Sequence, residues 1–456
     1  MSKPNIVLVV LDSVRRDHLG CYGYHRNTTP NIDRIAQEGM LYTRASASSC
    51  WTLPSHASMF TGLYPSEHRV DLDTQHLDPG HRTLASRLQD RGYATASISC
   101  NGWVTRHSNL THGFDHAVDV GELMGGSESF LSRAVRGLHR RWRRLTERDR
   151  GARRATRLAE EWIGDRTDGQ PFFLFMNYMD CHLPYKLQSP ERHRFVDEDR
   201  KAEVESVPQE PFAVMAGRET LSAQDLEDLR ALYDGCLSYL DKHVARLDRR
   251  LRELGLAQNT LLAITSDHGE SFGEHGLLDH QYGLYENLLS VPLVIRMPDE
   301  GEVGEDERLV QLVDLVPTFL ELAGGAPESD EMQQAVPFLG APRRPVVMAE
   351  YLVPNVRAIR RRFPDADVER FDVALRSIST GTEKLIWGSD GRTELYDLEA
   401  DPGETKSMAT VRPDVVRRLR ATFEERLGDW PVKEAVPGPK PVDAAVKARL
   451  EDLGYL

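Results

Sequence analysis

The chain has 456 residues and a formal net charge of −14, from 57 lysines and arginines against 71 aspartates and glutamates. Hydrophobic residues make up 40% and charged residues 28%, which is typical of a folded globular protein and argues against disordered, collagenous or fibrous classes. The negative balance predicts no general binding of nucleic acid or of anionic membranes, so an anionic substrate would need a local site. The length allows a large catalytic domain and a smaller one.

No window approaches the roughly 20 consecutive apolar residues that span a bilayer. The N-terminal apolar run at 6–11 leads directly into charged residues and lacks the small-residue cleavage site of a secretory signal. We therefore expect no membrane span and a cytoplasmic protein. The five cysteines are widely spaced and contain no CxxC pair, which argues against a disulfide framework and a structural zinc site. Whether the chain forms a homo-oligomer is left open.

Short apolar runs, bounded by polar turns, alternate with helical patterns through much of the chain. Runs of this length are typical of strands buried on both faces, and their alternation with helices predicts an α/β protein with a doubly wound, mostly parallel sheet. Apolar residues at helical spacing over 221–254 predict one of the covering helices. The predicted strands lie at 6–11, 94–99, 172–176, 261–265 and 291–295.

The pattern changes at about residue 340. Short alternating segments and a turn-rich stretch, followed by a helical pattern, predict a smaller C-terminal α+β subdomain over 341–456, beside a catalytic domain over 1–340. The segments are two strands at 346–348 and 384–387, the turns at 388–404 and the helix at 413–427.

Two arginine-rich segments interrupt this organisation, at 133–157 and 357–362. We interpret the first as an insertion over about 125–160. A solvated helix face or a mobile insertion is favoured over a binding site for a polyanionic partner, because charge runs are commonly solvated.

Polar side chains follow several of the predicted strands. In open α/β sheets, ligands collect outside the carboxyl ends of the strands. Two carboxylates attract a divalent cation, and an imidazole widens the choice from Ca²⁺ or Mg²⁺ toward Mn²⁺ or Zn²⁺. An aspartate after a strand is also an ordinary turn former or helix cap. The residues are Asp12, Asn101, Asp180 and His182, and Asp267 with His268, of which Asp12, Asp267 and His268 form the predicted metal site.

The segment 49–62 reads SCWTLPSHASMFTG. Pro54 suits the first turn of a helix and Gly62 its end, so Thr52 is predicted to lie just before the helix N-terminus. Unpaired backbone N–H groups and the positive end of the helix dipole would bind a tetrahedral oxyanion beside a hydroxyl nucleophile. Thr52 is equally well explained as a helix cap.

At this point the sequence resembles the sulfatase family of the alkaline phosphatase superfamily, over nearly its whole length. Matching segments occur in the family's order and with similar spacing. They include PNIVLVVLDSVRRDHLGCYGY, TPNIDRIAQEGMLYTRA, TLPSHASMFTGLYPSEH, FFLFMNYMDCHLPY, TSDHGESFGEHGLLDHQYGLYE and ELYDLEADPGET. The resemblance implies an alkaline phosphatase-like fold and cleavage of a small anionic ester.

The resemblance also implies roles for individual residues. The family's metal ligands match Asp12, Asp267 and His268, and its nucleophile matches Thr52. His182 matches a histidine near the substrate oxyanion or leaving group, and His280 stands where related enzymes often have a lysine that contacts the anion. Two weaker candidates for binding the substrate are His56 and Asn101. Each histidine could instead be structural.

Two departures from the family pattern bear on the reaction. Sulfatases usually carry Cys or Ser in a C/S-x-P-x-R motif that is converted to formylglycine, whereas this chain has Thr52 and His56 at the first and last positions. Threonine cannot become that aldehyde, and Cys50 is two residues too early, so we expect no formylglycine. Ser13 replaces the second aspartate of many members, so we expect one strongly held divalent ion.

We therefore predict a metal-dependent hydrolase of phosphodiesters or phosphonate monoesters that acts through a covalent Thr52 intermediate. Two alternatives are a sulfatase without formylglycine and a phosphoryl-group transferase. A non-enzyme alternative is a catalytically silent protein that binds a polyanion through the arginine-rich segment.

Overall fold

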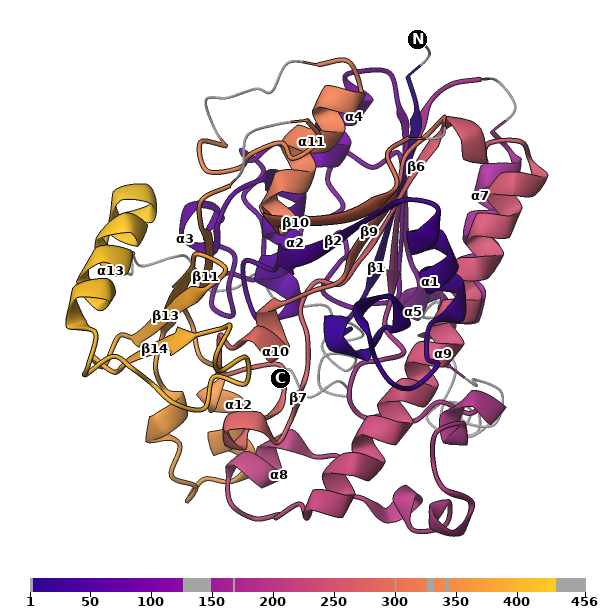
Figure 1. Ribbon diagram of the computed structural model, residues 1–456. Helices are drawn as coiled ribbons and strands as arrows, with labels where there is room; N and C mark the ends of the chain where they lie inside the picture. Colours follow the sequence, from indigo (N-terminus) through magenta and orange to yellow (C-terminus); the bar gives the residue numbers. More distant parts are fainter. Residues whose placement is uncertain are drawn as a thin grey trace, which may run out of the picture.

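The computed structural model describes residues 3–125, 149–166, 169–299, 301–325, 332–340 and 344–431 (Figure 1). An eight-stranded sheet with the order β10-β2-β9-β6-β1-β5-β3-β4 runs through its centre. Only β9 is antiparallel to its neighbours among the strand pairs of this described sheet. The mostly parallel α/β sheet is thus confirmed. Its strands are β1 (Asn5–Leu11), β2 (Met40–Ser46), β3 (Ala94–Ser99), β4 (His116–Asp119), β5 (Phe172–Tyr178), β6 (Thr260–Thr265), β9 (Leu293–Arg296) and β10 (Gly304–Gln311).

Strand β1 lies in the middle of this sheet, and all seven of its residues are buried. It pairs in parallel with β5 on one side and β6 on the other, with Ile6 opposite both Phe173 and Leu261. Successive side chains point to opposite faces, so Leu8 and Val9 enter different hydrophobic cores. The continuous apolar run was predictable because both faces of the strand are covered.

Helices cover both faces (Figure 1). Three of them, α1 (Pro30–Gln37), α7 (Ala152–Gly164) and α9 (Ala223–Glu253), contribute to the core on the Val9 face. The opposite face is covered by α2 (Thr52–Thr61), α4 (Leu84–Gln89) and α11 (Leu315–Leu322). The predicted helix at 221–254 is confirmed as α9, whose start is fixed by a capping box of Ser222 and Asp225.

A second, four-stranded antiparallel sheet confirms the small C-terminal α+β unit. Its strands are β11 (Val347–Tyr351), β12 (Leu375–Ser379), β13 (Glu383–Gly388) and β14 (Thr393–Asp397), in that order. Helix α13 (Pro413–Leu427) packs on it through Val415, Leu419 and Phe423. The division of the chain at residue 340 stays a prediction. The remaining elements are α3 (Pro65–His68), α5 (Val120–Gly125), α8 (Pro211–Met215), β7 (Ser271–Phe272), β8 (Leu278–Asp279), α10 (Glu286–Leu289) and α12 (Val356–Arg362).

One prediction about the elements needs correction. The strand predicted at 291–295 begins later, at Leu293, because Pro292 cannot donate a ladder hydrogen bond. Within the segment predicted as an insertion over about 125–160, Ala152–Gly164 forms the covering helix α7 with its alanine face buried, and the insertion itself stays a prediction. Residues 126–148 of that segment lie outside the described residues. Among the described helices, none combines the length and apolarity needed to cross a membrane.

Candidate active site

The predicted site residues meet where the parallel strands end. Asp12 follows β1, Asn101 follows β3, and Asp267 with His268 follows β6. Thr52 is the first residue of α2. All five side chains are buried, with no more than 1% of their surface exposed. Because these three parallel strands end on the same side of the sheet, residues more than 200 positions apart come into contact.

The side chains of Asp12, Asp267 and His268 form one group of potential metal ligands. Each of the three side chains offers one ligand atom, and these three atoms lie within 4.8 Å of one another. The Nδ1 of His268 donates to the Gly269 carbonyl at 2.9 Å, which leaves the lone pair on Nε2, 3.3 Å from Asp267 Oδ2. Metal-binding histidines commonly donate their second nitrogen in this way.

The charges of this group suit a divalent cation. Burial raises the pKa of Asp12, and the neighbouring Asp267 raises it further. Burial likewise raises the pKa of Asp267, whose buried Oδ2 accepts no hydrogen bond from the described residues. Burial and then His280 lower the pKa of His268 to about 3, so its ring is the neutral form that binds metals. Two desolvated carboxylates and a neutral imidazole therefore fit one cation.

Hydrogen bonds hold Asp12 in place. Its Oδ2 accepts from Asn101 Nδ2 at 2.7 Å and from Asn177 Nδ2 at 3.3 Å. Ser13 donates its hydroxyl to Asp12 Oδ1 at 3.1 Å and its backbone N–H to Asp267 Oδ1 at 3.2 Å. The serine at the position of a second family aspartate thus links the two carboxylates, with its backbone in the left-handed region at φ 60°.

Thr52 does not cap its helix. The cap position belongs to Trp51, and no side-chain cap hydrogen bond forms there. The sequence predicted that Thr52 lies just before the helix. In the structure Thr52 is the first residue of the helix, so the predicted start is corrected by one residue. Its Oγ1 lies 3.3 Å from His268 Nε2 and 3.5 Å from Asn101 Nδ2, so the hydroxyl faces the carboxylate and imidazole group.

His56 lies one turn further along the same helix and faces Asp267. Its Nδ1 donates to the Thr52 carbonyl at 2.9 Å and lies 3.4 Å from Asp267 Oδ2. The ring packs edge-on against Phe60 and Phe175. These contacts help to position the Asp267 carboxylate. The contact of His56 with the substrate stays a prediction.

His182 and His280 lie beside the first group. The His280 ring stacks on His268 with centroids 4.4 Å apart and meets His182 at 4.9 Å. Asp279 contacts His280 Nδ1. Although burial acts to lower it, this carboxylate raises the pKa of His280 to about 9.

Sequence reasoning missed Asp279 and Glu270, which are both buried beside His280. The signal was their position at the two ends of the stretch 270–279 (ESFGEHGLLD), in which Phe272 and the pair Leu277–Leu278 flank a turn with two glycines. Strands β7 and β8 fold that stretch into a hairpin that pairs Ser271 with Asp279. The strands have two residues each, too short for the alternation of a strand to show.

Two other residues considered from the sequence lie outside the group. Asp180 accepts from the backbone N–H of Arg150 at 2.9 Å, and burial with Asp149 raises its pKa to about 7. Cys50 is fully buried, and this burial raises the pKa of its thiol.

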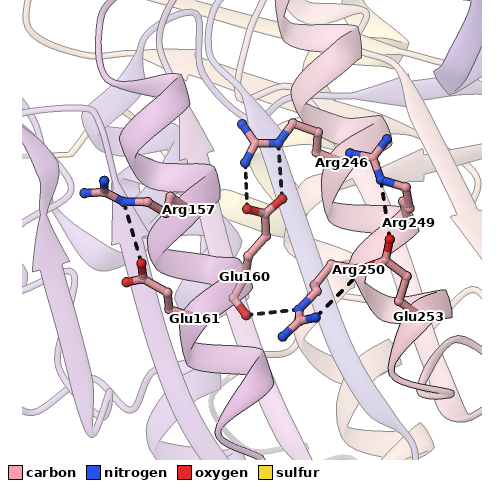
Figure 2. A pocket seen from close by; sticks show the side chains of 7 residues that line it. All are labelled: Arg157, Glu160, Glu161, Arg246, Arg249, Arg250 and Glu253. Atoms are coloured by element: carbon pink, nitrogen blue, oxygen red, sulfur yellow. Dashed lines mark hydrogen bonds and ion pairs between the residues drawn. The ribbon is translucent and has the colours of Figure 1, made fainter.

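A surface pocket lies elsewhere, between α7 and α9 (Figure 2). Its charged side chains pair with one another: Arg246 binds Glu160 at 2.6 Å, and Arg157 binds Glu161 at 3.7 Å. Arginines and glutamates therefore neutralise each other here. Arg157 is the last residue of the arginine-rich segment, and its pairing fits the solvated helix face that the sequence favoured.

The fold and the carboxylate, imidazole and hydroxyl groups at its strand ends define a class of hydrolases within the alkaline phosphatase superfamily. The sulfatase family model matches residues 4–326, and the model of the N-sulphoglucosamine sulphohydrolase C-terminal region matches residues 273–430. The chain therefore belongs to the sulfatase family.

Individual relatives cover most of the chain. A multifunctional alkaline phosphatase superfamily protein, PehA, from Trinickia caryophylli is 28% identical over 90% of this chain and 92% of its own length. An N-acetylgalactosamine-6-O-sulfatase from Bacteroides thetaiotaomicron is 23% identical over 92% and 93%. The crystal structure of a phosphonate monoester hydrolase of Agrobacterium radiobacter aligns with a TM-score of 0.68 at 20% identity, over 92% of this chain and 94% of that one, and shows the shared fold.

Proposed function

We propose that this sulfatase-family hydrolase cleaves a small anionic ester by using Thr52 as its nucleophile. The observation that carries the proposal is the placement of the Thr52 hydroxyl, 3.3 Å from His268 Nε2 at the start of α2. Asp12, Asp267 and His268 would hold one divalent cation. When bound, such a cation lowers the pKa of a nearby hydroxyl and offsets negative charge on the ester.

Each step uses residues of this chain. Thr52 Oγ loses its proton to solvent and attacks the central phosphorus or sulfur atom, and the bond to the leaving-group oxygen breaks. His182 would pass a proton to the departing oxygen: its resting ring is neutral, because burial lowers its pKa and Nδ1–H bonds the Leu183 carbonyl, so Nε2 would first take that proton from solvent. The N-terminus of α2 and His280 would stabilise charge on the remaining oxygens. Water then cleaves the ester on Thr52, which releases the acid and restores the hydroxyl.

Two substrate classes remain, and each is favoured by a different observation. Sulfate esters are favoured by the comparisons, because most of the named relatives are sulfatases. These names support the sulfatase alternative better than the phosphodiesterase preference predicted from the sequence. Phosphorus esters are favoured by Thr52, since a threonine sulfate has no carbonyl route for expelling sulfate and must be attacked directly by water.

A parallel kinetic comparison tests both classes. The kcat/KM of the purified protein is measured for an aryl sulfate, a phosphate monoester, a phosphodiester and a phosphonate monoester, each with Mn²⁺, Zn²⁺, Ca²⁺ or Mg²⁺. The highest kcat/KM assigns the class, and an added alcohol acceptor distinguishes transfer from hydrolysis. Absence of Thr52-dependent turnover with every ester would contradict the proposed function.

A further inference from the structure

One arginine of the arginine-rich segment at 133–157 lies against the turn that carries His182. Arg150 stands just before α7, and its backbone N–H donates to Asp180 Oδ1 at 2.9 Å. Its side chain reaches the other end of the same turn, where Nη2 donates to the Pro184 carbonyl at 2.8 Å. Two hydrogen bonds thus hold Arg150 on both sides of His182. The mechanism proposed above gives this arginine no task.

The backbone around Arg150 is held independently of its side chain. The Asp149 carboxylate accepts the backbone N–H groups of Gly151 at 3.0 Å and Arg153 at 2.9 Å. It also accepts the hydroxyl of Tyr239, a residue of α9, at 2.6 Å. This carboxylate therefore ties the start of α7 to a second covering helix. Because the backbone is fixed in advance, the arginine loses less conformational freedom when it binds a ligand.

The charge of Arg150 reaches the ring of His182. Burial lowers the pKa of His182 most, and the positive charges of His280 and Arg150 lower it further. Because such an effect falls off with distance, the guanidinium lies near the imidazole that the proposed mechanism assigns to the departing oxygen. Positive charge is thus placed on the leaving-group side of the site.

Arg150 is partly exposed, whereas His182 beside it is only 1% exposed. A guanidinium carries five N–H donors in a planar fork that matches the oxygens of a carboxylate, sulfate or phosphate. Asp180 contacts Arg150 at the backbone, and burial with Asp149 raises the pKa of this carboxyl to about 7, so it is only partly ionised at neutral pH. The protein as a whole has a net charge of −14, so an anionic group needs local positive charge to bind.

We propose that Arg150 is a specificity-determining residue for the departing alcohol, whose own anionic group its guanidinium binds. The preferred substrate is then an ester whose alcohol carries a carboxylate, sulfate or phosphate in addition to the group that is cleaved. The inference deepens the proposed function and rests on it, because His182 marks the leaving-group side.

Matched pairs of aryl esters test this proposal. Their leaving groups are the meta and para isomers of hydroxybenzoate and of hydroxybenzamide, which place a carboxylate or a neutral amide at the same position. The kcat/KM of each ester is measured with the wild type, Arg150→Gln, Arg150→Lys and the control Arg157→Gln, which removes one charge from the exposed face of α7. The ratio of anionic to neutral ester within each protein cancels a general effect of the substitution on the site.

We expect this ratio to fall about tenfold or more in Arg150→Gln, because charge-assisted hydrogen bonds are lost. Arg150→Lys should keep part of the ratio, since the charge remains and the planar fork does not. Arg157→Gln should keep the wild-type ratio. For both isomers, an equal ratio in the wild type and Arg150→Gln overturns the proposal and leaves Arg150 a residue that only positions the turn.

A test on the wild type covers the case in which Arg150→Gln does not fold, which circular dichroism would show. Raising sodium chloride from about 0.05 M to about 0.5 M screens the contact and should lower the ratio. A ratio that stays constant over this range overturns the proposal.

A binding measurement separates this proposal from the proposed function. Thr52→Ala, with and without Arg150→Gln, is titrated with meta- and para-hydroxybenzoate and the two hydroxybenzamides, and binding is followed by ligand-observed nuclear magnetic resonance. Tighter binding of a hydroxybenzoate that is lost with Arg150 supports the inference. Equal affinities with and without Arg150 overturn it, even where Thr52-dependent turnover is intact. Absence of Thr52-dependent turnover with every ester contradicts the proposed function instead.

Discussion

The imidazole rings of His268 and His280 stack with centroids 4.4 Å apart and planes 25° apart. His268 follows a central strand, whereas His280 ends a small hairpin, so the stack joins two separately built parts of the site. His182 then meets His280 edge-on. Because the three rings share contacts, we expect the effects of substituting them to be non-additive in double-mutant cycles.

Replacing Thr52 by alanine should lower kcat by about 10⁴-fold or more, because the nucleophile is lost. Thr52→Ser keeps a hydroxyl and should retain measurable turnover. Steady-state kinetics with a reactive aryl ester measures both. Mass spectrometry of the resting wild type should show Thr52 and Cys50 unmodified. Turnover of Thr52→Ala near the wild-type rate would remove Thr52 from the mechanism.

Asn101→Ala should weaken the affinity of the first metal site by about 10-fold to 100-fold, since the amide that holds Asp12 Oδ2 at 2.7 Å is lost. Asn177→Ala removes the longer contact of 3.3 Å and should have a smaller effect. Competition with a chelating dye measures both affinities. Equal affinity in the wild type and Asn101→Ala would show that this hydrogen bond does not position the ligand.

His182→Ala should slow the cleavage of esters with basic leaving groups more than that of esters with acidic ones. The reason is that proton transfer to the departing oxygen matters most for a poor leaving group. A plot of log kcat/KM against leaving-group pKa should therefore become steeper. A parallel downward shift without a change in slope would assign His182 to positioning or packing.

His280→Ala should raise KM about tenfold, because a positive group beside the anion is lost, and His280→Lys distinguishes how that charge arises. If His280 contacts the anion as an imidazolium, lysine restores most of the KM. If lysine restores none of the KM, His280 does not act on the anion through its charge. Unchanged kinetics in His280→Ala would remove this residue from the site.

His243 should make stability depend on pH. It bonds Thr156 Oγ1 at 2.8 Å, and burial lowers its pKa to about 4. In the unfolded chain the pKa of His243 is about 6.5. As pH falls from 6.5 toward 4, His243 therefore binds a proton in the unfolded chain but not in the folded one, so the free energy of unfolding decreases. The Tm of the wild type should exceed that of His243→Gln most at pH 7 and least near pH 4. A constant Tm difference across this range would contradict the assignment.

Much of the sheet could be predicted because its central strands are apolar on both faces. The edge strands could not: in β10, Gly304 and Glu305 are exposed, and β2 mixes buried and partly buried residues, so neither forms a continuous apolar run. The sequence pointed to three candidate metal ligands because they come shortly after strands that continuous apolar runs predict. They are Asp12, Asp267 and His268. Asp279 and Glu270 were not, since a hairpin of two-residue strands brings them to the site.

The sequence by itself determined the fold class, the sulfatase family and the threonine at position 52, because these depend on local apolar runs and on residue identity. Only the tertiary structure decided which polar side chains come into contact at the site. Trp51 rather than Thr52 occupies the helix cap, and four buried carboxylates meet three histidines at one edge of the sheet. Such contacts join residues far apart in the chain, and only the packed sheet and hairpin set their distances.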